Sequence, residues 1–152
     1  MSYLRVLAEA SWVGGGRPYL VEQSNQSRLG ELLSGLGFEV STVRLTEDAS
    51  VAELLDDIGA RLGWPHPTGG NWWGFQDYYM NIPNEGRGPY AILIENSDNF
   101  LRVGPRCFAT VIHKLLSITE EFGPWPNTEI PLEFFFLGAW GVDSTEVEKV
   151  KF

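Results

Sequence analysis

The chain has 152 residues, of which 43% are hydrophobic and 13% aromatic, enough apolar material for one packed domain, and this composition excludes a disordered polymer. Its 20 Asp and Glu residues outnumber 11 Lys and Arg residues, and the formal net charge of −9 argues against nucleic acid as a partner, because phosphate binding needs basic patches. A field of this sign favours a basic partner.

The apolar segments and the single cysteine indicate the compartment. The longest apolar runs, 91–94 and 134–137, are too short to cross a bilayer, and Arg5 and Glu9 interrupt the N-terminal stretch that a secretory signal would need. Cys107 is alone, so the sequence predicts neither an internal disulfide nor a zinc cage built from cysteines. We expect a cytoplasmic protein with no membrane association.

The first third of the chain predicts two strands, a helix and a third strand. Residues 3–13 have a mixed pattern that we interpret as a strand, and residues 19–21 form a second strand after a glycine triplet. Residues 25–36 carry four leucines on one helical face, and Gly37 follows where a left-handed C-cap belongs. Residues 38–45 alternate apolar and polar side chains, which is typical of a strand.

Two helices are predicted in the middle of the chain. Ser50 and Glu53 have the spacing of a capping box, which begins a helix with apolar residues at helical intervals. Residues 64–70 contain two prolines and two glycines and predict a loop. Asn71 is a good N-cap for an aromatic helix over 72–80.

The last part of the chain completes the pattern of an α/β protein. Residues 90–95 and 130–137 are short apolar runs, as expected for strands that are covered on both faces. Between them Pro105 suits the first turn of a long helix, and residues 145–152 alternate in a way that could add an edge strand. This order predicts a small parallel β-sheet of about three to four strands covered by helices.

The sequence offers little for catalysis. His66 and His113 are the only histidines, and His113 lies six residues after Cys107 on one predicted helix, about 120° around its axis, so these two cannot form a dyad within that helix. No metal-binding spacing or nucleophile elbow is present in the sequence. We therefore predict no catalytic residue, no metal and no cofactor.

The aromatic helix has two neighbouring faces. Trp72, Phe75 and Tyr79 share one face, which suits burial. The other face carries Trp73, Gln76, Asp77 and Met80. A face with an aromatic ring beside polar groups is typical of an interface hot spot, but it is equally consistent with a tryptophan that packs on the adjacent loop.

The order of elements from residue 50 to residue 137 resembles the barstar family of ribonuclease inhibitors. Pro65, Gly69, Asn71 and Asp77 fall without a gap on the Pro, Gly, Asn and second Asp of that family's loop–helix motif, and Phe75 replaces its Leu. Residues 18–45 resemble the extra strand–helix unit of longer family members. The resemblance implies one domain over 1–152, with a core of 18–138 and terminal extensions of 1–17 and 139–152.

The resemblance also implies a function as an immunity protein or antitoxin. The loop and helix over 67–80 would block the active site of a cognate basic ribonuclease toxin in a 1:1 complex, and the free protein would be a monomer. Asp77 would stand in for an RNA phosphate, because groups that hold phosphate also bind carboxylate. The expected partner-binding residues are Pro67, Thr68, Gly69, Gly70, Trp73, Gln76, Asp77 and Met80.

The chain departs from the family pattern at several contact positions. Trp73 stands at the motif's first Asp, Gln76 at its exposed Trp, and Ile118 near a further contacting acid. One phosphate mimic remains, on a more aromatic surface. Two alternatives stay open: a non-inhibitory interaction module on the same fold, and a small hydrolase that uses Asp77 with His66.

Overall fold

The computed structural model describes residues 3–13, 17–48, 50–64, 69–81, 89–121 and 132–141. Its centre is a sheet of four parallel strands in the order β1-β4-β3-β2. The strands are β1 (Tyr19–Glu22), β2 (Glu39–Arg44), β3 (Tyr90–Glu95) and β4 (Leu132–Gly138). The α-helices are α1 (Tyr3–Glu9), α2 (Gln26–Gly35), α3 (Val51–Arg61), α4 (Trp72–Asn81), α5 (Asp98–Val103) and α6 (Pro105–Glu121). Two short 3₁₀ turns, η1 (Ser11–Val13) and η2 (Gln23–Asn25), flank β1.

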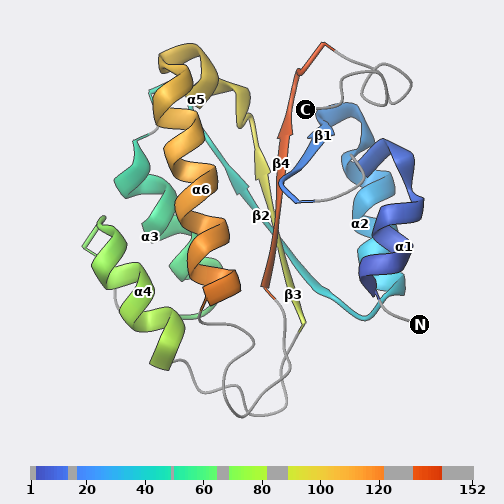
Figure 1. Ribbon diagram of the computed structural model, residues 1–152, viewed down its shortest axis with the longest axis horizontal. Coiled ribbons are helices and arrows are strands. Elements are labelled where there is room, and N and C mark those ends of the chain that lie inside the picture. The colour runs from blue at the N-terminus through green and yellow to red at the C-terminus, as the bar shows by residue number, and fades with distance from the viewer. Residues whose placement is uncertain are drawn as a thin grey trace.

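Helices cover both faces of the sheet. The chain passes from β1 through α2 to β2 at the opposite edge, and it then returns through β3 to β4, which lies beside β1. Figure 1 shows α3, α4, α5 and α6 on one side of the sheet and α1 and α2 on the other. The predicted α/β class with a small parallel sheet covered by helices is confirmed.

The central position of β3 and β4 explains why their sequences are almost continuously apolar. Successive side chains of a strand point to opposite faces, so both sets must be buried when helices cover both faces. Ile92 of β3 and Phe134 of β4 join the core under α3–α6, whereas Leu93 and Phe135 join the core under α1 and α2. Tyr19 of the edge strand β1 stacks on Phe135, with ring centroids 4.9 Å apart.

The predicted caps have the geometry that the sequence indicated. The Ser50 side chain accepts a hydrogen bond from the Glu53 backbone N–H at 3.2 Å, and α3 begins at the next residue. Gly37 has a φ of 91°, a left-handed conformation that glycine adopts without steric cost. The helix predicted over 25–36 is α2, and the aromatic helix predicted over 72–80 is α4.

One predicted element was wrong, and one element was not predicted. Residues 3–13, interpreted as a strand, form α1 and η1, and their buried side chains Leu7 and Val13 cover the second face of the sheet. That face is apolar and needs helical cover, a demand that the mixed local pattern does not reveal. The six-residue helix α5 was not predicted, because it is too short to show a period. Residues 14–16 and the predicted edge strand at 145–152 lie outside the described residues.

One buried charge lies on the α1–α2 face of the sheet. Glu133 of β4 is 2% exposed and accepts hydrogen bonds from Arg17, one of them from Nε to Oε2 at 3.0 Å. A buried carboxylate is costly unless a hydrogen-bonded cation accompanies it, and Arg17 fulfils that role. Burial, followed by the nearby Glu133 charge, raises the pKa of Tyr19 above its usual value. Among the helices of the described ranges, none combines the length and apolar character that crossing a bilayer requires.

Candidate functional site

The loop that leads into α4 is shaped by two glycines and a cap. Gly69 and Gly70 have φ values of 77° and 70°, which side chains rarely adopt. A Cβ on Gly70 would come within 2.6 Å of the Ala52 Cβ, so the loop packs directly on the start of α3. The Asn71 Oδ1 accepts a hydrogen bond from the Gly74 N–H at 2.8 Å, and the predicted N-cap is confirmed. These contacts fix where α4 begins.

Aromatic packing then holds α4 against α3. Phe75 and Tyr79 are 0% and 1% exposed, as their shared helical face predicted, whereas Trp72 is only partly buried. The Trp64 ring stacks on Tyr78 at 5.3 Å and meets Phe75 edge-on at 5.2 Å. The sequence predicts only a loop at Trp64, although a tryptophan directly after a helix end is a usable signal of docking.

A glycine on α3 makes room for the Trp64 ring. A Cβ built on Gly59 would approach the Trp64 Cε3 to 2.7 Å, closer than real Cβ contacts. The absence of a side chain at Gly59 therefore lets the Trp64 ring pack directly against α3, and the same ring contacts Phe75 and Tyr78 of α4. As a result, α4 is a platform that aromatic packing holds against α3.

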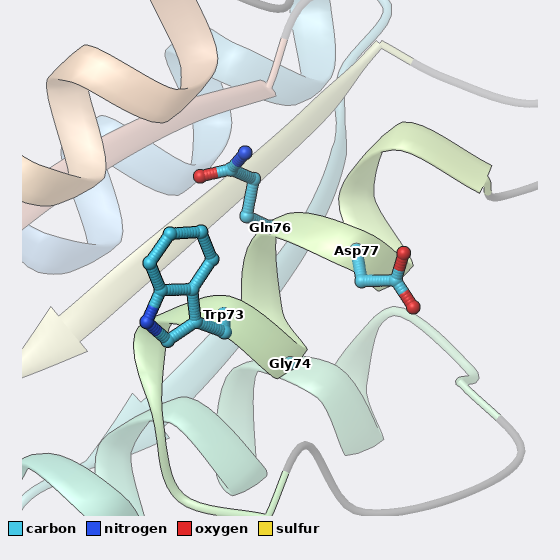
Figure 2. A pocket seen from close by; sticks show the side chains of 4 residues that line it. All are labelled: Trp73, Gly74, Gln76 and Asp77. Atoms are coloured by element: carbon cyan, nitrogen blue, oxygen red, sulfur yellow. The ribbon is translucent and has the colours of Figure 1, made fainter.

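The outward side of this platform carries the predicted hot-spot face. Trp73 is 81% exposed, the highest value among the large hydrophobic residues described. Asp77 is exposed and Gln76 is half-buried. Together with Gly74, these three side chains line a shallow depression of about 380 Å³. In Figure 2 the Trp73 indole and the Gln76 amide lie to one side of α4, and the Asp77 carboxylate points to the other.

The structure describes only some of the other predicted contact residues. Gly69 is exposed beside the start of α4, and Gly70 is half-buried against α3. Met80 belongs to α4, but its side chain lies outside the described residues, as do Pro67 and Thr68. The structure thus places Gly69 beside the start of α4 and Trp73, Gln76 and Asp77 along its first two turns. Exposure of Trp73 and Asp77 is confirmed, and their role in binding stays a prediction.

Charges around the platform are distributed unevenly. On α3, Glu53 and Asp57 are exposed and Asp56 is half-buried, so acid predominates beside α4. On the other flank the Lys114 Nζ of α6 lies 5.7 Å from the Trp72 ring centroid, a cation–π contact. Lys114 could not be recognised from the sequence, because its proximity to Trp72 depends on how α4 and α6 pack.

Beneath the platform lies a phenol with a strongly shifted pKa. Burial, followed by the Glu133 charge, raises the pKa of Tyr79 to about 12. Tyr79 is therefore neutral at physiological pH, and it belongs to the core rather than to the exposed face.

The carboxyl end of the sheet, where open α/β folds commonly bind ligands, is tied together by internal hydrogen bonds. Gln23 accepts from the Asn96 backbone N–H at 2.9 Å. Glu95 accepts from the Gln26 amide at 2.5 Å and from the Arg44 Nε at 3.0 Å. These bonds join η2 and α2 to the carboxyl end of β3, and they join the ends of β2 and β3 to each other.

Trp140 lies between the carboxyl ends of β1 and β4. Its indole N–H donates to the carbonyls of Val21 at 3.0 Å and Phe136 at 3.3 Å, and so bridges the two strands. Its backbone N–H donates to Glu22 at 3.2 Å, and its ring meets Phe108 of α6 at 5.5 Å. The indole therefore occupies the position between the carboxyl ends of β1 and β4.

The chemistry available for catalysis is sparse in the described part of the chain. His113 is exposed, and Cys107 is a half-buried free thiol. His66, the proposed partner of Asp77 in a hydrolase, lies outside the described residues. Across the described ranges, no group of three or more His, Cys, Asp or Glu side chains could hold a metal ion. The α4 surface is the better candidate site.

Comparisons with known proteins found no similar chain. No family model, curated protein or solved structure matches it. The resemblance to the barstar family stays a prediction that depends on the quoted residues and on the order of the elements.

Proposed function

We propose that this protein is an immunity protein or antitoxin of the barstar type. It acts in the cytoplasm as a monomer, binds a basic ribonuclease-like toxin 1:1, and blocks the toxin's active site with the loop and helix over 67–80. The observation that carries this proposal is Trp73, a tryptophan 81% exposed on a rigid helix beside the exposed Asp77.

An exposed tryptophan on a fixed helix is an efficient binding element. A tryptophan buries about 200 Å² in an interface, which at roughly 25 cal/mol per Å² amounts to about 5 kcal/mol before the costs of association. Because α4 is held by Trp64, Phe75 and Tyr79, little ordering cost is expected on binding. Aromatic residues in such positions are enriched among interface hot spots.

The charge of the chain supports a basic partner. The net charge is −9, and Asp77 of α4 and Glu53 and Asp57 of the adjacent α3 are exposed. A field of this sign steers a cationic protein toward its complement and raises the association rate. A ribonuclease active site is cationic because it binds phosphate, so a carboxylate fits there.

The test is affinity capture followed by an activity assay. The immobilised protein is exposed to lysate and culture medium of its source cell, with the Trp73→Ala variant as a parallel bait. We expect a small basic ribonuclease on the wild-type bait, a stoichiometry of one in calorimetry, and loss of RNA cleavage at a 1:1 ratio.

Two results contradict the proposal. A captured partner whose activity is unaffected by the complex supports the alternative of a non-inhibitory interaction module. Equal capture by the wild-type protein and by Trp73→Ala shows that the α4 surface is not the binding site. The control variant is Val103→Ala, which removes a 69% exposed apolar side chain from α5, at the other end of the α3–α6 layer (Figure 1).

A further inference from the structure

The outer face of α6 is basic in a protein whose net charge is −9. Arg106, His113 and Lys114 are exposed on this helix, and α6 has no acidic residue before Glu120. We propose that this α6 stripe, defined by the three exposed residues, is a second contact surface that binds an acidic segment of the same toxin. The inference rests on the proposed function and deepens it, because it names a feature that the cognate toxin has besides a cationic active site.

Helix geometry places the stripe on one side of α6. Arg106 and His113 are seven residues apart, which is two turns, and Lys114 directly follows His113. At 1.5 Å per residue the stripe extends about 12 Å along the helix. Val111 and Leu115 on the opposite side are buried in the core. The basic groups therefore face away from the core and are accessible to a partner.

The two cations of the stripe have no acidic partner among the described residues. Arg17 and Arg44 each pair with a glutamate of the sheet. In contrast, no ion pair joins Arg106 or Lys114 to an acid in the described ranges. The Lys114 ammonium lies 5.7 Å from the Trp72 ring centroid, a contact that neutralises no charge. Both cations can therefore pair with carboxylates of a bound protein.

The position of Arg106 disfavours the helix that carries it. Arg106 is the second residue of α6, a helix with no acid in its first turn and no base in its last turn. The positive end of the helix dipole lies at the first turn, where an anion is favourable and a cation is unfavourable. An exposed arginine there contributes nothing to folding within the described part of the chain, and this favours a role in binding.

The stripe begins beside the α4 surface. Lys114 contacts Trp72, and Trp72 precedes the exposed Trp73. A standard interface covers about 800 Å² of each partner, a patch roughly 30 Å across. A toxin seated on Trp73 can therefore reach the stripe, which is about 12 Å long, within one interface.

The surrounding charges favour an acidic protein segment over a nucleic acid. Carboxylates at fixed positions can pair with the two cations, and such pairs fix the orientation of a complex and reject partners of the wrong charge. An RNA chain would bring further phosphates toward an acidic molecule, where Glu53 and Asp57 are exposed on α3. The stripe would thus distinguish the cognate toxin from other basic ribonucleases.

Charge reversal gives the inference a distinctive sign. Lys114→Glu, Arg106→Glu and the control Arg28→Glu each replace one positive charge with one negative charge, so the net charge changes by two, from −9 to −11. Arg28 is exposed on α2, on the other side of the sheet (Figure 1). Because the toxin is basic, the control should bind it as tightly as the wild type or more tightly. Both α6 variants should instead raise the Kd about fivefold or more, as measured by calorimetry.

The two α6 variants separate binding from folding. Lys114→Glu also removes the contact with Trp72, whereas Arg106→Glu affects no ring contact of the described residues. Arg106→Glu places an acid at the positive end of the helix dipole, so its midpoint of urea unfolding should not fall. Weaker binding at unchanged or higher stability is the result expected for Arg106→Glu, and a purely structural role would not produce it.

Carbodiimide cross-linking identifies the acidic segment directly. The reagent activates a carboxylate, and a lysine amine then attacks it to form an amide. In the complex with the captured ribonuclease we expect a peptide that joins Lys114 to an Asp or Glu of the toxin, detected by mass spectrometry. Lys114→Arg keeps the positive charge but lacks the amine, so it should bind within twofold of the wild type and lose this cross-link.

The failures are distinguishable. If the ribonuclease is captured and inhibited but both α6 variants bind it as Arg28→Glu does, the inference is wrong and the proposed function stands. If the free protein retains an RNA oligonucleotide in a gel-shift assay and Lys114→Glu abolishes this binding, the stripe is a nucleic-acid surface, and the inference is again wrong. If no ribonuclease is captured or inhibited, both fail together.

Discussion

Replacing Trp73 with alanine should separate binding from folding. About a fifth of the Trp73 surface is covered in the free protein, because 81% is exposed. For a side chain of about 250 Å² this corresponds to roughly 50 Å² of covered surface, worth about 1 kcal/mol at ~25 cal/mol per Å². The higher helix propensity of alanine returns about 0.5 kcal/mol. The free energy of unfolding should therefore fall by 1 kcal/mol or less.

Affinity for the partner should fall much more. Truncating a central aromatic anchor costs about 2 kcal/mol or more, which raises the Kd at least about 30-fold. Unfolding is followed in urea by far-UV circular dichroism, since the substitution removes an indole and would alter the fluorescence. Affinity is measured by calorimetry with the captured ribonuclease.

Two control variants bracket the expected result for Trp73→Ala. Val103→Ala removes an exposed apolar side chain on α5 and should change neither quantity appreciably. Phe75→Ala empties a fully buried position two residues further along α4 and should cost about 3–5 kcal/mol of stability. The reasoning is refuted if Trp73→Ala destabilises the protein as Phe75→Ala does, or if it binds the partner within twofold of the wild type.

Four further predictions follow from charge, capping and burial. Asp77→Asn should cost about 2–5 kcal/mol of binding and about 0.5 kcal/mol of stability, measured by calorimetry and urea unfolding; the reverse pattern would assign Asp77 to the fold. The association rate should fall about tenfold from low to high salt in stopped-flow experiments, and a salt-independent rate would leave charge steering unsupported. Asn71→Ala should lower the unfolding free energy by about 1 kcal/mol through loss of the cap on Gly74, whereas Asn71→Asp should retain it. The Tyr79 pKa of about 12 exceeds the unfolded value of 10.0, so the folded protein favours the neutral phenol. That contribution to the free energy of unfolding, roughly 3 kcal/mol, is complete below pH 10 and is lost as the pH rises to 12. The Tyr79→Phe variant should therefore lose less stability than the wild type between pH 10 and pH 12, as measured by unfolding at a series of pH values. An unchanged stability profile would contradict the assignment.

The candidate face on α4 was readable from the sequence because helix geometry is local. A period of 3.6 residues places Trp73, Gln76 and Asp77 together, and the burial of Phe75 and Tyr79 on the neighbouring face decides which side points outward. The Asn71 cap needed only its three-residue spacing to Gly74.

The support of that face could not be read in the same way. The contact between Gly59 and Trp64, and the approach of Gly70 to Ala52, depend on how α3 and α4 cross. Lys114 reaches Trp72 only because α6 lies beside α4. Each of these contacts joins residues whose proximity is set by tertiary packing.

The sequence by itself determined the α/β class, the four strands that form the sheet, the helices α2, α3, α4 and α6, and the exposed aromatic face. Each of these depends on residues within a few positions of one another. Only the tertiary structure decided the strand order β1-β4-β3-β2, the helical form of residues 3–13 and the position of Trp140 between β1 and β4. Those features satisfy demands that arise after the strands have assembled: an apolar second face needs cover, a buried Glu133 needs Arg17, and free carbonyls at strand ends need donors.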